Sequence, residues 1–295
     1  MTVIKRSNKS IQALDLPVIA NINPRSIYNK INEFHTFVKQ ENIDIVFMSE
    51  SWEREEKTLV DIIQLDDHEI ISNVFQRKGK GGRPAIIVNK KKYSVQNLTN
   101  TIINIKWGVE VVWCLLTPRN VTANSKIKKI ACASIYCKPN SRNKTDLIDH
   151  MTEAYNISCT KYQGGLHFII AGDTNDLNLT PILSLSPNLL QIVKKPTRVD
   201  PVTFVEKILD PVMTTLGSYY QTPQCLPPLD ADPETNGKSS DHRIVLVNPI
   251  SSINNECSRS IRNITITNHT IKHRKDENLV DKSKLDTSIR SRFCS

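Results

Sequence analysis

Short apolar runs recur along the chain from about residue 17 to residue 248, and each has the length of a β-strand. Eight runs rich in valine or isoleucine are PVIANI, IDIVFM, EIISNV, PAIIVN, VEVVWCLL, IKKIACASIY, LHFIIAG and HRIVLV. Runs of this length without strict alternation are typical of strands buried on both faces. The pattern therefore predicts a protein built mainly on β-sheets.

Two segments between these runs have a helical period instead. The first is expected to open at Asn23-Pro24, because asparagine caps helices and proline fits a first turn. Its apolar stripe comprises Ile27, Ile31, Phe34 and Val38. The second is expected from Thr145 to Ile157. Many strands and few helices argue against a TIM barrel or a doubly wound sheet, so we expect an α/β fold of two packed sheets with outer helices.

Composition and length agree with a large folded domain. With 295 residues, of which 39% are hydrophobic, the chain is too apolar to be disordered, and no run approaches the roughly 18 apolar residues of a membrane helix. We expect the domain to span 15–250, preceded by an extension over 1–14. A basic, flexible tail over 251–295 would carry +4 of the net charge of +9.

The seven cysteines form no CxxC pair and no zinc-ligand spacing with histidine, so we expect no structural metal. The first twenty residues lack the apolar core of a secretion signal. These features predict a nuclear or cytoplasmic protein that is not secreted, without membrane partners, and we expect a monomer.

Polar residues stand where the apolar runs begin or end. They are Asn21, Glu50, Tyr136, Asp173, Asn175, Asp210, Asp241 and His242. Strand ends hold side chains rigidly while the adjoining loops leave them accessible, so α/β proteins build their sites there. The pattern predicts that these residues form one cluster.

Each of these residues also has a structural interpretation when it is taken alone. Asn21 fits a turn, and Asn23 fits a helix cap better than a catalytic group. Asp173 after Gly172 fits an Asx-turn, and His242 fits an exposed imidazole at the start of a strand. Their joint order and spacing favour the functional interpretation.

Read in order, the motifs resemble those of the endonuclease/exonuclease/phosphatase superfamily. They are Asn21-Ile-Asn23, MSE ending at Glu50, GKGG at 79–82, YCKP from Tyr136, GDTN from Gly172, ILD ending at Asp210 and SSDH ending at His242. More narrowly, the Asn-Pro-x-Ser opening and KPTR at 195–198 resemble the apurinic-type endonuclease domain of non-LTR (LINE-like) retrotransposon polyproteins.

The resemblance implies a DNase I-like fold, a four-layer sandwich of two mixed sheets flanked by helices. It also implies Mg²⁺- or Mn²⁺-dependent phosphodiester hydrolysis in which one DNA strand is nicked to leave a 3′-hydroxyl and a 5′-phosphate. By the same resemblance Glu50 binds the metal, with Asn21 and Asp241 close to it. Asp173 and Asn175 then orient water and hold the phosphate, which His242 contacts while Asp210 orients the histidine.

The chemistry accounts for the same residue types independently of the family. Mg²⁺ prefers oxygen ligands and needs only one or two carboxylates, so Glu50 with Asp241 is a sufficient set. A histidine held by a carboxylate keeps one tautomer and is stabilised when protonated, which suits His242 with Asp210. The hydroxyl of Tyr136 can donate to a phosphate oxygen.

Two acid-free basic runs, at 77–92 and 125–144, fit either solvated sheet edges or a surface that follows DNA phosphates. We expect Arg83 and Lys138, from these runs, and Thr203 to bind substrate.

Two alternatives stay open. The fold could act on a lipid or small phosphoester, or the chain could be a non-catalytic DNA-binding relic of a retrotransposon. Pro211, which follows Asp210 and lacks a backbone donor, and the lack of a following reverse transcriptase region motivate the relic, and Thr174 stands where the family usually has an aromatic residue.

Overall fold

The computed structural model describes residues 16–250 except 55, 73–80, 107, 121–126, 201 and 231–239. Within this part of the chain, two six-stranded mixed sheets account for most of the strands. The first sheet has the order β13-β14-β1-β2-β4-β3. Its strands are β1 Ile19–Ile22, β2 Ile45–Met48, β3 His68–Ser72, β4 Ala85–Asn89, β13 Gln224–Leu226 and β14 Ile244–Val247.

The second sheet has the order β5-β6-β7-β8-β12-β9. Its strands are β5 Tyr93–Asn97, β6 Glu110–Pro118, β7 Lys129–Tyr136, β8 Leu166–Asp173, β9 Leu190–Gln191 and β12 Val212–Thr214. In each sheet one central pair, β1 with β2 and β7 with β8, is parallel, and the other pairs are antiparallel. Both sheets are therefore mixed, as expected.

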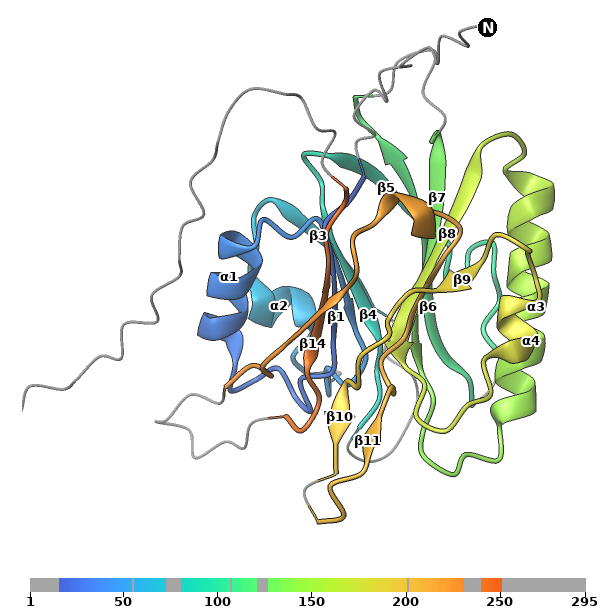
Figure 1. The fold of residues 1–295 in the computed structure, drawn as a ribbon. Helices are drawn as coiled ribbons and strands as arrows, with labels where there is room; N and C mark the ends of the chain where they lie inside the picture. Colours follow the sequence, from blue (N-terminus) through green and yellow to red (C-terminus); the bar gives the residue numbers. More distant parts are fainter. Residues whose placement is uncertain are drawn as a thin grey trace, which may run out of the picture. The chain divides into compact units, whose positions relative to one another are not determined.

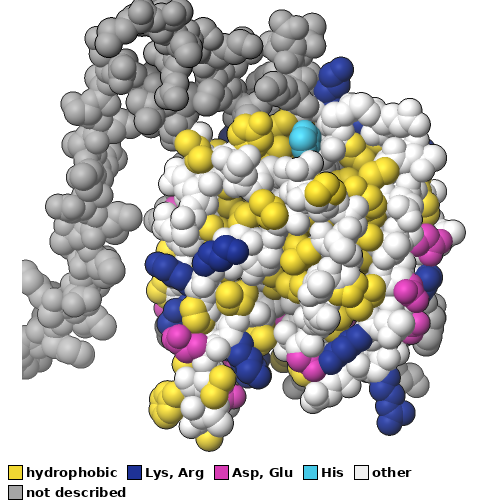
Figure 2. Space-filling view, turned by 45° about the vertical axis from the view of Figure 1, so that its right-hand side comes forward, with side chains coloured by type: hydrophobic (Ala, Val, Ile, Leu, Met, Phe, Trp, Pro, Cys, Tyr) yellow, Lys and Arg dark blue, Asp and Glu magenta, His cyan; other side chains and the backbone are white. Residues whose placement is uncertain are grey.

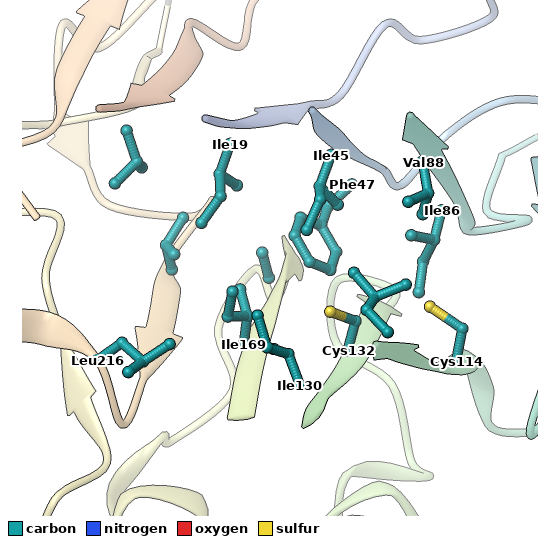
Figure 3. Close-up of a cluster of buried hydrophobic side chains, with 14 of the residues drawn as sticks. Ile19, Ile45, Phe47, Ile86, Val88, Cys114, Ile130, Cys132, Ile169 and Leu216 are labelled. Carbon is teal, nitrogen blue, oxygen red and sulfur yellow. The ribbon is translucent and has the colours of Figure 1, made fainter. Parts of the chain in front are cut away.

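The inner faces of the two sheets pack against each other and form one apolar core. Side chains of the first sheet, such as Phe47 and Ile86, face Cys114, Cys132 and Ile169 of the second (Figure 3). All five are completely buried. Because both faces of the central strands are covered, their sequences are continuous apolar runs rather than alternating ones.

Helices cover the outer faces of both sheets. α1 (Ile31–Gln40) and α2 (Leu59–Ile63) pack on the first sheet, and α3 (Lys144–Lys161) and α4 (Thr180–Leu183) pack on the second. Figure 1 shows the resulting order of layers, helix, sheet, sheet, helix. The prediction of a four-layer α/β sandwich is confirmed. None of the described helices is both long and apolar enough to cross a membrane.

A small hairpin extends beyond the sheets. Its strands are β10 (Arg198–Val199) and β11 (Glu206–Lys207), and it projects from one end of the sandwich (Figure 1). Its tip exposes apolar side chains, with Val202 82% and Phe204 76% exposed. A single 3₁₀ turn, η1 (Gly217–Tyr219), follows β12.

All eight apolar runs contain strands, and the second predicted helix is confirmed as the longer α3. The start of the first helix was predicted wrongly. Helix α1 begins at Ile31 after Lys30, because Arg25 and Ser26 adopt positive φ angles and the amide of Ser26 donates to Glu50 O, 2.9 Å away. Predictions for residues 1–14 and 251–295, and for Gly79 and Lys80, concern parts outside the described residues.

Candidate active site

The polar residues at the strand ends meet at one edge of the two sheets, which we call the polar edge. The parallel pairs β1–β2 and β7–β8 bring four carboxyl ends there, and the antiparallel partners β12 and β14 bring two amino ends. Register places Tyr136 directly opposite Asp173. The Asn21 amide of β1 donates to Gly172 O of β8, which joins the two sheets at this edge.

Asp210 and His242 form a buried pair at the polar edge. His242 Nδ1 lies 2.8 and 3.1 Å from the two Asp210 oxygens, and the side chains are only 0% and 5% exposed. Burial opposes protonation of the imidazole, but the Asp210 carboxylate outweighs it and raises the pKa of His242 to about 9. The imidazole is therefore held in one orientation with Nε2 left for other contacts, and the exposed-imidazole interpretation is wrong.

Thr197, from the KPTR segment, positions this pair. Its hydroxyl accepts hydrogen bonds from the amides of Leu209 and Asp210, at 3.0 and 3.1 Å, and the Thr197 carbonyl accepts from the amide of Arg243. Pro211 removes no donor from β12, because it precedes the first residue of that strand. Its carbonyl accepts a hydrogen bond from the Asn21 side chain. The KPTR segment carried only the resemblance, and this contact was not predicted.

Asp173 lies beside the pair and has two contacts of its own. Its Oδ1 accepts from the Asn175 amide at 3.0 Å, which is an Asx-turn, and its Oδ2 accepts from Asn23 Nδ2 at 2.8 Å. The Asx-turn interpretation is thus confirmed, and the functional role of Asp173 stays a prediction. Burial and the nearby Asp210 carboxylate raise the pKa of Asp173 to about 8. The side chain of Asn175 donates to Cys137 O.

Asn23 belongs to this cluster and does not cap a helix. Its Nδ2 also lies 3.3 Å from Glu50 Oε1, so one amide bridges the carboxylates of Glu50 and Asp173. Ser240 fixes the same loop, because its hydroxyl donates to Asn23 O at 2.6 Å and accepts from the His242 amide. Asn23 and Ser240 lie within the quoted motifs, but no periodicity separates a bridging amide from a capping one.

Asn21 lies on β1, two residues before Asn23, and is completely buried. Its Nδ2 donates to the carbonyls of Gly172 and Pro211, so it ties β1 to the end of β8, which carries Asp173, and to the segment just before β12, which carries Asp210. Its Oδ1 has no hydrogen-bond partner among the described residues. The structure therefore gives Asn21 a contact between the sheets, and its predicted place beside a metal stays a prediction.

Gly172 allows the close approach of β7 and β8 at the polar edge. Its φ is +138°, and a Cβ there would lie 2.0 Å from Ile135 O. No larger residue fits without moving backbone. The glycine of GDTN is therefore a packing requirement that sets the position of Asp173.

Tyr136 and Glu50 border the same small space. A Cβ on Gly81 would lie 3.6 Å from the Tyr136 hydroxyl and 3.8 Å from Glu50 Oε2. Trp52 Nε1 donates to the same Glu50 oxygen at 3.0 Å. The predicted catalytic tyrosine and the predicted metal-binding glutamate thus face one glycine turn.

Asp241 lies at the mouth of the cluster and pairs with two arginines. Arg25 Nη1 lies 3.1 Å from its Oδ1, and Arg198 Nε lies 2.8 Å from its Oδ2. Partial burial opposes ionisation, but His242, Arg198 and Arg25 outweigh it and lower the pKa of Asp241. Both oxygens of this predicted metal ligand are therefore engaged by cations of the chain.

The three predicted substrate-binding residues lie in three different places. Arg83 donates from Nη1 to Glu53 O and from its amide to Glu110 Oε2, so it braces the loop before β4. Lys138 is exposed and borders a pocket of about 30 Å³ that Tyr136 also lines. Thr203 is exposed at the hairpin tip, where its amide donates to Asp200.

The donor set fits a divalent cation. Asp173, Asp210 and His242 offer ligand atoms that all lie within 4.8 Å of one another. Burial and the neighbouring Asp210 carboxylate raise the pKa of Asp173, and the Asn23 amide lies between Asp173 and Glu50. Such an oxygen-rich site suits Mg²⁺ or Mn²⁺, which would relieve the repulsion.

No protein-family model and no curated protein matches the sequence. Solved structures do share its fold. The endonuclease domain of TRAS1, a telomere-specific non-LTR retrotransposon, is 12% identical with a TM-score of 0.56, covering 80% of this chain and 99% of that chain. An AP endonuclease from Archaeoglobus fulgidus is 13% identical with a TM-score of 0.53, covering 80% and 100%.

A third structure is the 3′ phosphatase NExo from Neisseria, bound to product DNA hairpin. It is 10% identical with a TM-score of 0.55, and the match covers 80% of this chain and all of that chain. At these identities the likeness establishes architecture only. The chain therefore has the DNase I-like fold of endonuclease/exonuclease/phosphatase proteins.

Proposed function

We propose that this protein is a Mg²⁺- or Mn²⁺-dependent phosphodiester hydrolase that nicks one strand of DNA, leaving a 3′-hydroxyl and a 5′-phosphate. The observation that carries the proposal is the buried Asp210–His242 pair beside Asp173, with all three within 4.8 Å of one another. Hydrolysis of a phosphodiester needs an aligned water and positive charge near the phosphate oxygens, and this cluster can supply both.

Each residue has a role that follows from its contacts. His242 is held by Asp210 with its proton stabilised, so Nε2 can donate to a phosphate oxygen. Asp173 is fixed by the Asn175 amide and can accept a proton from the attacking water. Tyr136, opposite Asp173 in the sheet, can donate its hydroxyl to the phosphate.

Glu50, with the Asn23 amide beside it, would hold the divalent cation. When bound, the cation would lower the pKa of water and neutralise charge on the phosphate. Asn23 would then have to turn its amide, because its nitrogen now faces both carboxylates. Placing Asn23 rather than Asp241 beside the cation follows from the arginine pairs of Asp241.

DNA as the substrate is supported by the hairpin and by the structural comparisons. The hairpin of β10 and β11 starts at Arg198, beside the cluster, and its apolar tip stands free of the sandwich, as the projection in Figure 2 shows. An exposed apolar tip of this kind can enter a DNA groove. Origin from a non-LTR retrotransposon is supported by the likeness to the TRAS1 domain and by the opening motif.

The test is nicking of supercoiled plasmid DNA. With Mg²⁺ the protein should convert supercoiled plasmid to open circles, and EDTA should stop the reaction. His242→Ala and Glu50→Ala should each abolish it, whereas His35→Ala, far from the cluster, should not. Binding of DNA without cleavage under Mg²⁺ or Mn²⁺ would identify a relic, and phosphate release from lipid with intact plasmid would identify a phosphoesterase.

A further inference from the structure

The two arginines on Asp241 come from distant parts of the chain. Arg25 lies in the loop after β1, and Arg198 begins the hairpin strand β10. Their contacts are with different oxygens of one carboxylate, Arg25 Nη1 at 3.1 Å from Oδ1 and Arg198 Nε at 2.8 Å from Oδ2. A single acidic side chain thus fixes two guanidinium groups at the mouth of the cluster.

The guanidinium groups keep donors for another partner. Each guanidinium has five N–H donors and uses one of them on Asp241 in these contacts. The side chains of Arg25 and Arg198 are 51% and 32% exposed, so solvent reaches them. Two positive charges against one negative charge leave this group of three side chains with a net positive charge.

The pair also lies next to the catalytic histidine. His242 Nε2, the ring nitrogen that Asp210 does not occupy, is 4.0 Å from Asp241 Oδ1, the same oxygen that Arg25 contacts. Arg198 forms an isolated β-bridge with His242. A phosphate that reaches His242 therefore comes close to both guanidinium groups.

We infer that Arg25 and Arg198 form a binding subsite for the sugar-phosphate backbone of the nucleic acid, with Asp241 as the positioning residue that holds both. This inference rests on the proposed function and deepens it. Guanidinium groups bind phosphate through paired N–H donors, and groups already held in place lose less entropy on binding. Backbone contacts of this kind place the strand without reading its sequence.

The experiment measures binding of a labelled DNA duplex by fluorescence anisotropy in EDTA, where no cleavage occurs, over a series of salt concentrations. Arg25→Ala and Arg198→Ala should each raise Kd about 5- to 10-fold and reduce the slope of log K against log salt by about one. The matched control is Arg119→Ala, an exposed arginine after β6 that donates to Lys90 O. It should change Kd less than about twofold, because salt screens the effect of a distant exposed charge.

Kinetics on plasmid DNA give an independent readout. Both variants should raise KM with kcat within about threefold, because the contact is made equally in the ground and transition states. Arg25→Lys should retain the salt slope but only part of the affinity, since lysine supplies a point charge without paired donors. Thermal melts of the metal-free variants check that each is folded.

The inference is overturned if Arg25→Ala and Arg198→Ala bind DNA as Arg119→Ala does, since the ion pairs would then only attach the hairpin. If the wild type nicks plasmid and these variants match it in KM, the subsite fails while the nuclease stands. If the wild type binds DNA and never nicks it, weaker binding by the two variants still supports the subsite while the nuclease proposal fails.

Discussion

The two ends of the sandwich both collect histidines and acidic residues, but they differ in how the charges are balanced. Opposite the polar edge, at the start of β2, lies a cleft of about 600 Å³ between α1, α2 and the sheet, which we call the α1–α2 cleft. Its charged lining residues and histidines are His35, Lys39, Asp44, Asp66, Asp67, His68 and Lys92.

Two of the three acids that line the α1–α2 cleft have lysine partners. Lys92 Nζ lies 2.9 Å from the Asp44 carboxylate, and Lys91 Nζ lies 2.6 Å from Asp67. Ring nitrogens of His35 and His68 contact backbone carbonyls. At the polar edge, by contrast, carboxylates crowd one another and a histidine. What sets the polar edge apart is therefore its crowded buried carboxylates, and such groups are the better indication of a reactive site.

The largest expected difference between the two ends concerns catalysis. Asp210→Asn keeps the shape of the residue but removes the charge that stabilises protonated His242, so plasmid nicking should fall about 10³-fold or more. Asp67→Asn at the α1–α2 cleft is the matched change and should leave nicking within about twofold. Initial rates of nicking at saturating Mg²⁺ measure both. Equal rates for the two variants would remove the distinction.

Glycines at the two ends should differ in stability. Gly172→Ala would place a methyl group 2.0 Å from Ile135 O and should lower the free energy of unfolding by more than about 3 kcal/mol, or prevent folding. Gly164, in the turn before β8, also has a positive φ but nothing within 4 Å of a Cβ. Gly164→Ala should cost only about 1 kcal/mol. Urea denaturation compares them, and similar losses would contradict the close approach.

Histidines at the two ends should give pH dependences of opposite sign in metal-free protein. The pKa of His242 is raised to about 9, so its contribution, up to about 3 kcal/mol, is complete below pH 6.5 and lost as pH rises towards 9. Burial lowers the pKa of His68, so its neutral form is favoured and stability is lost as pH falls below 6.5.

Urea denaturation across pH 5–10 in EDTA tests this pair. His242→Gln should flatten the decline of the unfolding free energy on the alkaline side, and His68→Gln should flatten it on the acid side. If both substitutions act on the same side, the assignment of charge at one of the two ends is wrong.

The smallest expected effect is on the free energy of unfolding. It should rise for a substitution at the polar edge and fall for one at the α1–α2 cleft. Asp173→Asn removes a carboxylate that repels Asp210 and should raise the free energy of unfolding by about 1 kcal/mol above pH 8 without metal, while abolishing nicking. Asp44→Asn removes the partner of Lys92 and should lower it by about 1–2 kcal/mol. Destabilisation by both would show that Asp173 is already compensated.

Much of the fold could be predicted from local sequence. Runs such as IDIVFM and LHFIIAG are strands because the sheets that cover both of their faces require continuous apolar residues. The short strands β9 to β13 were not predicted, since two or three residues have no measurable period. The first helix was misplaced because Arg25 and Ser26 take positive φ angles in a loop that is held by hydrogen bonds to the distant Glu50 and Ser51 carbonyls.

The candidate site, like the fold, was predicted only in part. Motif order singled out Asp173, Asp210 and His242, and the structure brings these three together. Asn23 and Thr197 were missed because their roles depend on partners 150 and 13 residues away along the chain, which no spacing rule connects.

The sequence by itself determined the eight strands that form apolar runs and the polar residues at their ends, because these follow from burial. The tertiary structure alone decided which polar groups touch. It placed Asp241 between two arginines and Asn23 between two carboxylates, since contacts across two packed sheets depend on register and layer spacing that no single segment encodes.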